Sequence, residues 1–130
     1  MFLLDTNSLI FFFRGEGRVA QRLLATAPAE VALPAIVVYE LEVGVAASKA
    51  PERRRRQLGQ LLELVAVVPF GRREARSAAE VRASLEAAGR PIGPLDTLIA
   101  ATALAHRATL VTHNRRELTR VPGLRLDDWY

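Results

Sequence analysis

The chain has 130 residues, half of them hydrophobic, which is the usual size of one domain and enough apolar material for a buried core. It contains no cysteine, so disulfides, thiolate metal sites and a cysteine nucleophile are excluded. The net charge of +4 comes from 18 basic and 14 acidic side chains, and every basic one except Lys49 is an arginine. Arginine binds phosphate with two parallel hydrogen bonds, which favours a polyanionic ligand, although nucleotide bias in a genome also produces such a composition.

Short β-branched or leucine-rich segments alternate with longer helical patterns, which is typical of β-α-β units and a parallel sheet. The predicted strands are Phe2–Leu4, Val31–Leu33, Leu64–Val68, Thr109–Val111 and Leu124–Leu126. The predicted helices are Ser8–Ala25, Ala35–Ala47, Pro51–Leu62, Arg72–Ala88 and Leu95–Ala105. No repeat or linker interrupts the pattern. We therefore predict a single α/β domain over residues 1–130, with a central parallel sheet of four to five strands flanked by helices.

The N-terminal segment is apolar but does not fit a signal peptide or a membrane-spanning helix. Asp5 and Asn7 interrupt the apolar residues, and no basic region precedes them. We expect no membrane partner and a cytoplasmic location.

Polar residues lie where a parallel sheet presents its ligands, outside the carboxyl ends of its strands. Asp5 follows the first predicted strand, Glu40 lies early in the helix after the second, and Asn114 and Glu117 follow the fourth. Asp96 lies instead in the first turn of a helix, where the helix dipole could help to keep it ionised. Two such charges about 4 Å apart repel by roughly 4 kcal/mol at a surface-like dielectric. The pattern therefore indicates a divalent metal site and phosphoryl chemistry.

Two of these acidic residues also have a purely structural interpretation. Asp5 could only cap the first helix, although Thr6 and Asn7 could do so without it. Asp96 could only complement a helix dipole, which is worth about 0.3–1 kcal/mol. Taken alone, Asp96 favours the structural interpretation.

Glu40 and Glu42 cannot both face one site, because they are about 200° apart around a helix. Gly44 lies one turn after Glu40 and would leave room beside that carboxylate. We therefore assign Glu40 to the site and Glu42 to the solvent. The same spacing argument predicts open space beneath Asp96, beside the alanines that follow it by one and two turns.

Two further features concern contacts with a substrate. His113 follows a predicted strand beside the expected site and could touch a substrate phosphate. The basic run Arg53–Arg56 most often forms a solvated helix face, with contact to RNA or a partner protein as the alternative.

Four motifs together carry a family resemblance. They are Asp-Thr-Asn at residues 5–7, Glu-Leu-x-x-Gly at 40–44, Asp-x-x-Ile-Ala-Ala at 96–101 and Thr-x-Asn-x-x-Glu-Leu at 112–118. Their order and spacing resemble the PIN-domain ribonucleases, specifically the VapC toxins of bacterial toxin–antitoxin pairs, over nearly the whole chain. The segment from Pro91 to Trp129 is similar to the VapC subgroup that cuts initiator tRNA.

The resemblance implies a PIN-like fold in which Asp5, Glu40 and Asp96 are the acidic residues of a site for Mg²⁺ or Mn²⁺. For the fourth position it leaves two candidates: Asn114 could orient a ligand or water, or Glu117 could supply a fourth carboxylate. The implied activity is metal-dependent endonucleolytic hydrolysis of RNA, of tRNA and initiator tRNA in particular, which inhibits translation. The products would carry 5′-phosphate and 3′-hydroxyl ends, and both one-metal and two-metal mechanisms remain open.

The same resemblance implies a VapB-type antitoxin whose tail occupies the acidic site, and a homodimer.

Other classes of protein fit the sequence less well. A phosphatase of the haloacid dehalogenase type needs a second aspartate where this chain has Asn7, and there is no Gly-x4-Gly-Lys-Ser/Thr loop for a nucleotide. The alternative function is a non-catalytic PIN-like module that binds RNA or a partner protein. An uncompensated carboxylate cluster argues against it, because such a cluster repels phosphate in the absence of metal.

Overall fold

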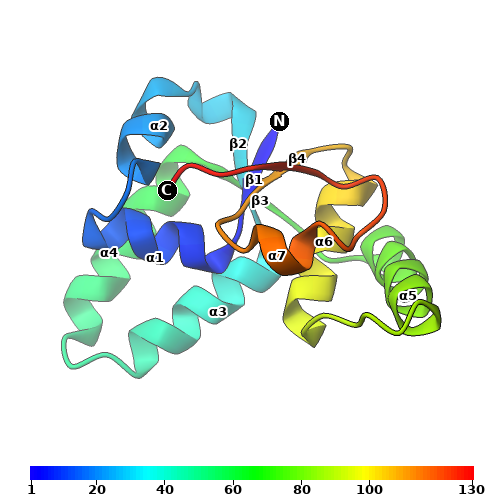
Figure 1. Ribbon diagram of the computed structural model, residues 1–130. Coiled ribbons are helices and arrows are strands. Elements are labelled where there is room, and N and C mark those ends of the chain that lie inside the picture. Colours follow the sequence, from blue (N-terminus) through cyan, green and yellow to red (C-terminus); the bar gives the residue numbers. More distant parts are fainter.

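The computed structural model describes all 130 residues and contains one five-stranded parallel sheet flanked by helices (Figure 1). In chain order the elements are β1 (Phe2–Leu4), α1 (Thr6–Arg14), α2 (Val19–Ala25), the 3₁₀ turn η1 (Pro28–Glu30), β2 (Val31–Pro34), α3 (Ala35–Ala46), α4 (Pro51–Leu64), β3 (Ala66–Val68), α5 (Arg72–Ala87), α6 (Pro94–Ala105), β4 (Thr109–Val111), α7 (Arg115–Leu118) and β5 (Arg125–Asp127). The predicted α/β class and the predicted parallel sheet are confirmed.

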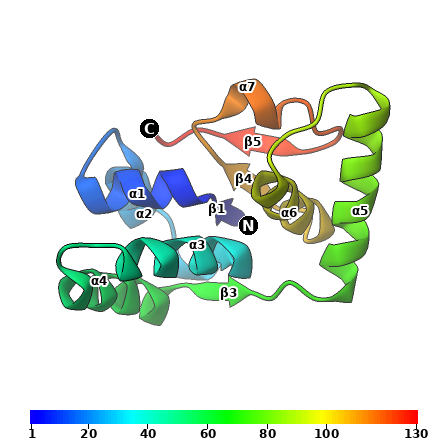
Figure 2. The same ribbon diagram turned by 90° about the horizontal axis from the view of Figure 1, so that it is seen from below.

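The strand order is β3-β2-β1-β4-β5, so the first strand of the chain lies in the middle of the sheet. From β1 the chain builds outward through β2 and β3, and then returns to the other side of β1 through β4 and β5. In Figure 1, α1, α2 and α4 lie to the left of the sheet, and α5 and α6 to its right. Figure 2 shows α7 beside β4 and β5. The order reverses at β1, and in sheets of this kind ligands bind outside the carboxyl ends of the strands at that point.

One predicted helix is wrong: the segment Ser8–Ala25 forms two helices rather than one. Gly15 and Gly17 have φ values of 69° and 63°, which lie in the left-handed region and end the helical repeat. Tyr130 packs against the second glycine so closely that a Cβ there would lie 2.7 Å from its carbonyl carbon. The sequence does not reveal the break, because α2 also turns apolar side chains, Val19 and Leu23, towards the core.

The other differences are at element ends. The β3 strand begins at Ala66 rather than Leu64 because α4 continues to Leu64, and β5 is displaced by one residue from its prediction. The short helix α7 and the turn η1 were not predicted, because four and three residues are too few to show a period.

The core lies between the sheet and its helices, where the side chains of Leu3, Leu33 and Leu110 are fully buried. Ala100 and Ala103 on α6 are also fully buried, so the open space predicted beneath Asp96 is wrong. Small side chains at these positions let α6 pack closely against its neighbours instead of leaving a gap. None of the helices combines the length and apolar sequence needed to cross a membrane.

Candidate active site

Asp5 joins β1 to α1 at the centre of the carboxyl edge of the sheet. Its backbone N–H donates to the carbonyl of Val111 at 3.1 Å, which ties the end of β1 to the end of β4. Its carboxylate Oδ1 accepts the backbone N–H of Ser8 at 2.9 Å, so Asp5 does cap α1. Only 7% of the residue is exposed. Burial raises the pKa of Asp5, the Thr112 hydroxyl and the Ser8 N–H oppose that rise, and the charge of Glu40 adds to it.

Glu40 reaches the same edge from α3. Its Oε1 accepts a hydrogen bond of 2.7 Å from the hydroxyl of Thr6 in the first turn of α1. Glu40 is half-buried and Glu42 is exposed, as the helical spacing predicted. A Cβ built on Gly44 would meet no atom within 4 Å, so the space predicted beside Glu40 is present.

Asp96 is the third residue of α6 and is half-buried. Its pKa is raised first by burial and then by the negative charges of Asp5, Glu117 and Glu40. Because each of these charges acts on Asp96, the structure brings together carboxylates from four separate segments of the chain. All the neighbouring charges that shift Asp96 are negative, so the cluster has no internal counter-charge.

The two candidates for the fourth position lie together after β4. The backbone N–H of Asn114 donates to the Thr112 hydroxyl at 3.0 Å, which fixes the turn. The Asn114 side-chain Nδ2 donates to Glu117 Oε2 at 3.4 Å. Glu117 therefore brings a carboxylate to the cluster, and Asn114 holds that carboxylate in place.

Sequence reasoning gave no role to the hydroxyl side chains that orient these acids. The Thr6 hydroxyl donates to Glu40, and the Thr112 hydroxyl accepts the Asn114 N–H and lowers the pKa of Asp5. Both threonines belong to the motifs that carry the family resemblance. Thr6 directly follows Asp5, and Thr112 lies two residues before Asn114. That adjacency is the signal that could have identified them.

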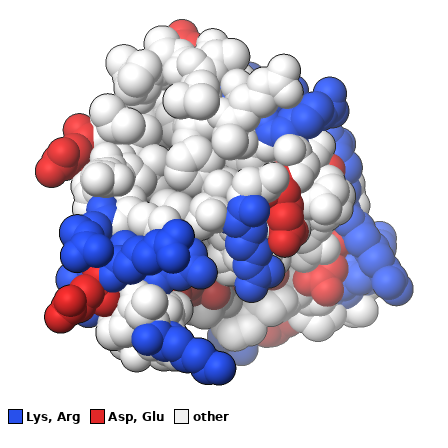
Figure 3. All heavy atoms as spheres, turned by 90° about the vertical axis from the view of Figure 1, so that its left-hand side faces the viewer, with Lys and Arg blue, Asp and Glu red and all other residues white.

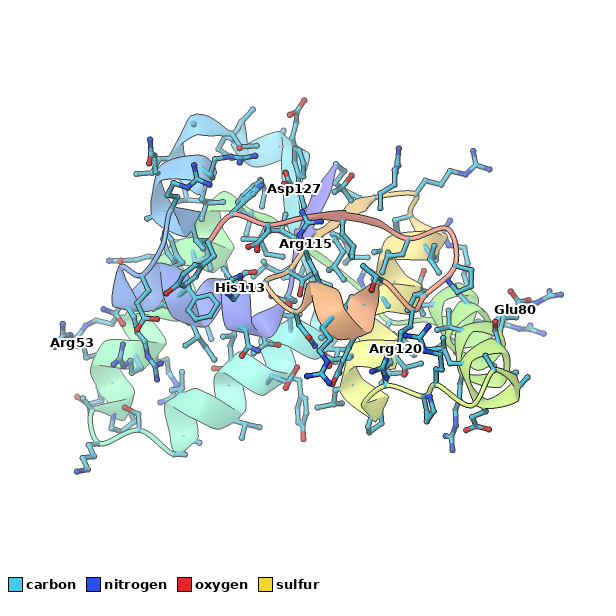
Figure 4. All side chains as sticks on the ribbon, in the orientation of Figure 1. Arg53, Glu80, His113, Arg115, Arg120 and Asp127 are labelled. Atoms are coloured by element: carbon cyan, nitrogen blue, oxygen red, sulfur yellow. The ribbon has the colours of Figure 1, made fainter.

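His113 lies at the rim of the cluster rather than within it. It extends, like Arg115, from the segment that follows β4 (Figure 4). Its Nδ1 lies 2.8 Å from Asp128 Oδ2, and its ring stacks on Tyr130 with 4.4 Å between centroids. Burial acts to raise the pKa of Asp128. The hydrogen bonds from the backbone N–H of Tyr130 and from the His113 ring outweigh this effect, so the pKa of Asp128 is lowered. The contact of His113 with a substrate phosphate stays a prediction.

The donor atoms suit a hard divalent cation. Asp5, Glu40, Asp96 and Glu117 offer only carboxylate oxygens, which are the ligands that Mg²⁺ and Mn²⁺ prefer. The structure holds no group of three or more acidic, histidine or cysteine side chains already arranged around one point as a metal cage. Mg²⁺ commonly uses one or two protein carboxylates and keeps several waters, so a pair such as Asp5 and Asp96 fits this ion.

The raised pKa values predict how metal-free stability depends on pH. Because the pKa of Asp96 is raised on folding, the folded state holds its proton to higher pH than the unfolded state does. The contribution of Asp96 to stability therefore falls as pH rises from about 4, the ordinary value, through the folded pKa. In EDTA, we compare the melting temperature of Asp96→Asn with that of the natural protein. As the pH rises from 4 to 7, the difference should change in favour of the variant. A constant difference across that range would contradict the charge crowding.

Addition of a divalent ion should oppose this loss of stability. An ion that binds only the folded state stabilises it by about 1.4 kcal/mol at ten times its dissociation constant. We expect Mg²⁺ or Mn²⁺ to raise the melting temperature of the natural protein at pH 7 and to raise that of Asp96→Asn much less.

Comparison with known proteins agrees with the fold. A family model described as the PIN domain matches residues 2–124. The chain is 31% identical to the tRNA(fMet)-specific endonuclease VapC of Salmonella typhimurium over 128 residues, which cover 98% of this chain and 97% of that protein.

Two solved structures are similar over almost their whole length. DNA-bound VapBC from Salmonella typhimurium superposes with a TM-score of 0.93 at 32% identity, covering 99% of this chain and 98% of that one. VapBC2 from Rickettsia felis, bound to a DNA fragment from its promoter, gives a TM-score of 0.92 at 33% identity, with the same coverage. The chain therefore belongs to the PIN-domain family and, within it, to the VapC proteins.

Proposed function

We propose that this protein is the toxin of a VapBC-type pair and a Mg²⁺-dependent endoribonuclease. Its substrate is tRNA, initiator tRNA in particular, and its action inhibits translation in the cytoplasm. The observation that carries this proposal is the convergence of Asp5, Glu40, Asp96 and Glu117 at the carboxyl edge of the sheet, where each of the other three raises the pKa of Asp96. The names of the similar proteins support RNA as the substrate and tRNA(fMet) as the preferred one.

The cluster suits hydrolysis of a phosphodiester by water. Asp5 and Asp96 would hold the cation, and Glu40 would hold a second cation or orient the attacking water. A bound Mg²⁺ or Mn²⁺ would acidify water and neutralise charge that grows on the phosphate. The Ser8 N–H and the Thr6 hydroxyl keep Asp5 and Glu40 in fixed orientations, which avoids reorganisation during the reaction.

The bond that breaks joins phosphorus to the 3′ oxygen, which leaves as a hydroxyl after taking a proton. Water supplies the new oxygen on phosphorus, so the products carry 5′-phosphate and 3′-hydroxyl ends. The exposed side chains of Arg115 and Arg116, beside the cluster on α7, would attract the RNA backbone. Selection of one tRNA would come from its shape and unpaired loops rather than from a duplex sequence.

A VapB-type antitoxin is the proposed partner, because the similar solved structures are VapBC complexes. Its tail would cover the acidic cluster, where a basic side chain could replace the cation. An apolar hollow of about 440 Å³ between α2 and α4 suits an amphipathic segment of such a partner. Leu24 and Leu64 at this hollow are 84% and 65% exposed.

A homodimer is also proposed, through the outer face of α3. Tyr39 and Val43 lie one turn apart on that helix and are 57% and 51% exposed. Adjacent exposed apolar side chains of this size are typical of a surface that another chain covers.

The test is cleavage of a bulk tRNA pool that contains initiator tRNA, with Mg²⁺, with Mn²⁺ and with EDTA, followed by mapping of the new ends. We expect cuts in initiator tRNA only with a metal, and 5′-phosphate at each cut. If the folded protein binds tRNA but cuts nothing with either ion, the non-catalytic module replaces this proposal. Cuts that persist in EDTA would remove the metal from the mechanism.

The roles of Glu117 and Asn114 can be separated by substitution. Glu117→Gln removes a charge that acts on Asp96, and we expect cleavage to fall by about 10- to 100-fold. Asn114→Ala only frees the Glu117 carboxylate, so its loss should be about tenfold or less. The comparison uses initial cleavage rates across a range of Mg²⁺ concentrations. A larger loss in Asn114→Ala than in Glu117→Gln would assign the fourth position to Asn114.

A further inference from the structure

A groove begins at the acidic cluster and leads away from it between α1, α3 and α4. Its volume is about 300 Å³, the lower end of the range for small-ligand sites. Glu40 lines the groove and is also one of the carboxylates that act on Asp96. Val45, five residues further along α3, and Ser48, in the bend that follows this helix, line it too, so the groove leads away from Glu40 by about 7.5 Å along α3 alone. A chain that occupied the cluster could therefore continue into this groove.

Two arginines from different helices line the same groove. Arg14 is the last residue of α1, and Arg54 lies in the first turns of α4. Neither forms a salt bridge, and the Arg54 guanidinium bonds only the neutral side chain of Gln57, at 3.3 Å. Charged side chains of both signs gather in the lower half of the face seen in Figure 3, while most of its upper half is uncharged. The groove thus offers two guanidinium groups that form no salt bridge.

The walls between these charges are apolar. Ile10 and Phe13 from α1 and Leu58 from α4 line the groove, and Phe13 is half-buried. The position of Gly44 is open, since a Cβ there would meet no atom within 4 Å. An aromatic wall with cations beside it is the arrangement that binds a single-stranded base and its phosphates.

We propose that this groove binds an unpaired nucleotide of the RNA next to the cleaved bond. The base and ribose lie against Phe13 and Ile10, and Arg14 and Arg54 contact the flanking phosphates. The proposal rests on RNA being the substrate of the acidic cluster. It favours RNA over a protein segment because two guanidinium groups that form no salt bridge match consecutive phosphates, and because the groove starts at the site of the reaction.

The test compares two double variants that remove the same charge. Arg14→Gln with Arg54→Gln removes the groove pair, and Arg53→Gln with Arg56→Gln removes exposed arginines of the same α4 run that do not line the groove. Arg53 points outward in Figure 4. For each double variant, kcat and KM are measured on tRNA. Binding of a fluorescent single-stranded RNA is measured on the same double variants with Asp96→Asn added, so that the RNA is not cut.

We expect the groove pair to raise KM and the RNA dissociation constant by about 10- to 100-fold, with little change in kcat. The slope of log affinity against log salt should fall by about 1.4, since each phosphate contact in a single strand contributes about 0.7. The control pair should change the slope and KM much less. Equal effects of the two pairs would overturn the proposal, because they would reduce it to general electrostatic attraction.

A second variant tests the space rather than the charge. Gly44→Leu fills the groove while replacing glycine with a better helix former, so α3 should remain folded. We expect a rise in KM similar to that of the groove pair. If RNA binding depends on the groove but nothing is cut, the proposed function fails, and the placement of the nucleotide next to a cleaved bond fails with it. If RNA binding is unchanged and only the affinity for the antitoxin falls, the groove belongs to the antitoxin and the inference is wrong.

Discussion

Replacement of Asp96 by asparagine should reduce RNA cleavage by about 10³-fold or more while leaving the protein folded. The side chain is half-buried and makes no hydrogen bond that holds α6, so the substitution removes a charge without removing a structural contact. The pKa of Asp96 is raised by three other carboxylates, which places it among the acids that a cation would neutralise. The measurement is the initial rate of tRNA cleavage at saturating Mg²⁺ and Mn²⁺.

Asp5→Asn is the matched second variant. Asparagine caps a helix as well as aspartate does, so the bond from Ser8 is retained while the negative charge is lost. We expect a loss of cleavage similar to that of Asp96→Asn. Glu42→Gln is the control, because Glu42 is exposed on the other side of α3, and its rate should stay within about twofold. Cleavage that survives both aspartate substitutions would remove the acidic cluster from the mechanism.

Replacement of Trp129 by alanine should lower the free energy of unfolding by about 3–5 kcal/mol. Trp129 is only 1% exposed, its Nε1 donates to Asp127 Oδ2 at 3.0 Å, and its ring lies 5.3 Å from that of Phe2. The Arg22 guanidinium lies 5.2 Å above the same ring and bonds Asp127 at 3.2 Å. The alanine variant would leave a cavity between the sheet and α2, and would free the end of β5.

Thermal unfolding followed by circular dichroism measures this effect, and the expected fall in melting temperature is about 10–20 °C. Trp129→Phe is the control, since it keeps an aromatic ring against Phe2 but loses the hydrogen bond to Asp127. Trp129→Phe should lower the melting temperature clearly less than Trp129→Ala does. If Trp129→Ala lowers the melting temperature by only a degree or two, the C-terminal segment does not stabilise the sheet as the packing indicates.

Local patterns were enough to predict most of the strands and helices. The strands Phe2–Leu4 and Thr109–Val111 lie where predicted, because short apolar runs between turn residues form buried parallel strands. The split between α1 and α2 was missed because it depends on two glycines in the left-handed region, and on Tyr130 lying against one of them. A contact with the far end of the chain leaves no trace in the local periodicity.

The orientation of Glu40 could also be predicted, from helical geometry alone. A 3.6-residue repeat places Glu40 and Glu42 on different faces, and the structure has the first half-buried and the second exposed. The same reasoning failed beneath Asp96, because whether a row of alanines leaves a gap depends on how closely the next helix packs. Periodicity gives the face of a helix but not the distance to its neighbour.

The sequence by itself determined the family resemblance, the α/β class and the acidic residues of the candidate site, because these depend on residue type and spacing along the chain. Only the tertiary structure decided that Glu117 acts on Asp96 while Asn114 holds Glu117, that Thr6 orients Glu40, and that Thr112 fixes the turn at Asn114. It alone showed that Arg14 and Arg54 line one groove with Glu40. Charges and hydrogen bonds act over a few ångströms in space, and the residues that they join here lie up to more than a hundred positions apart along the chain.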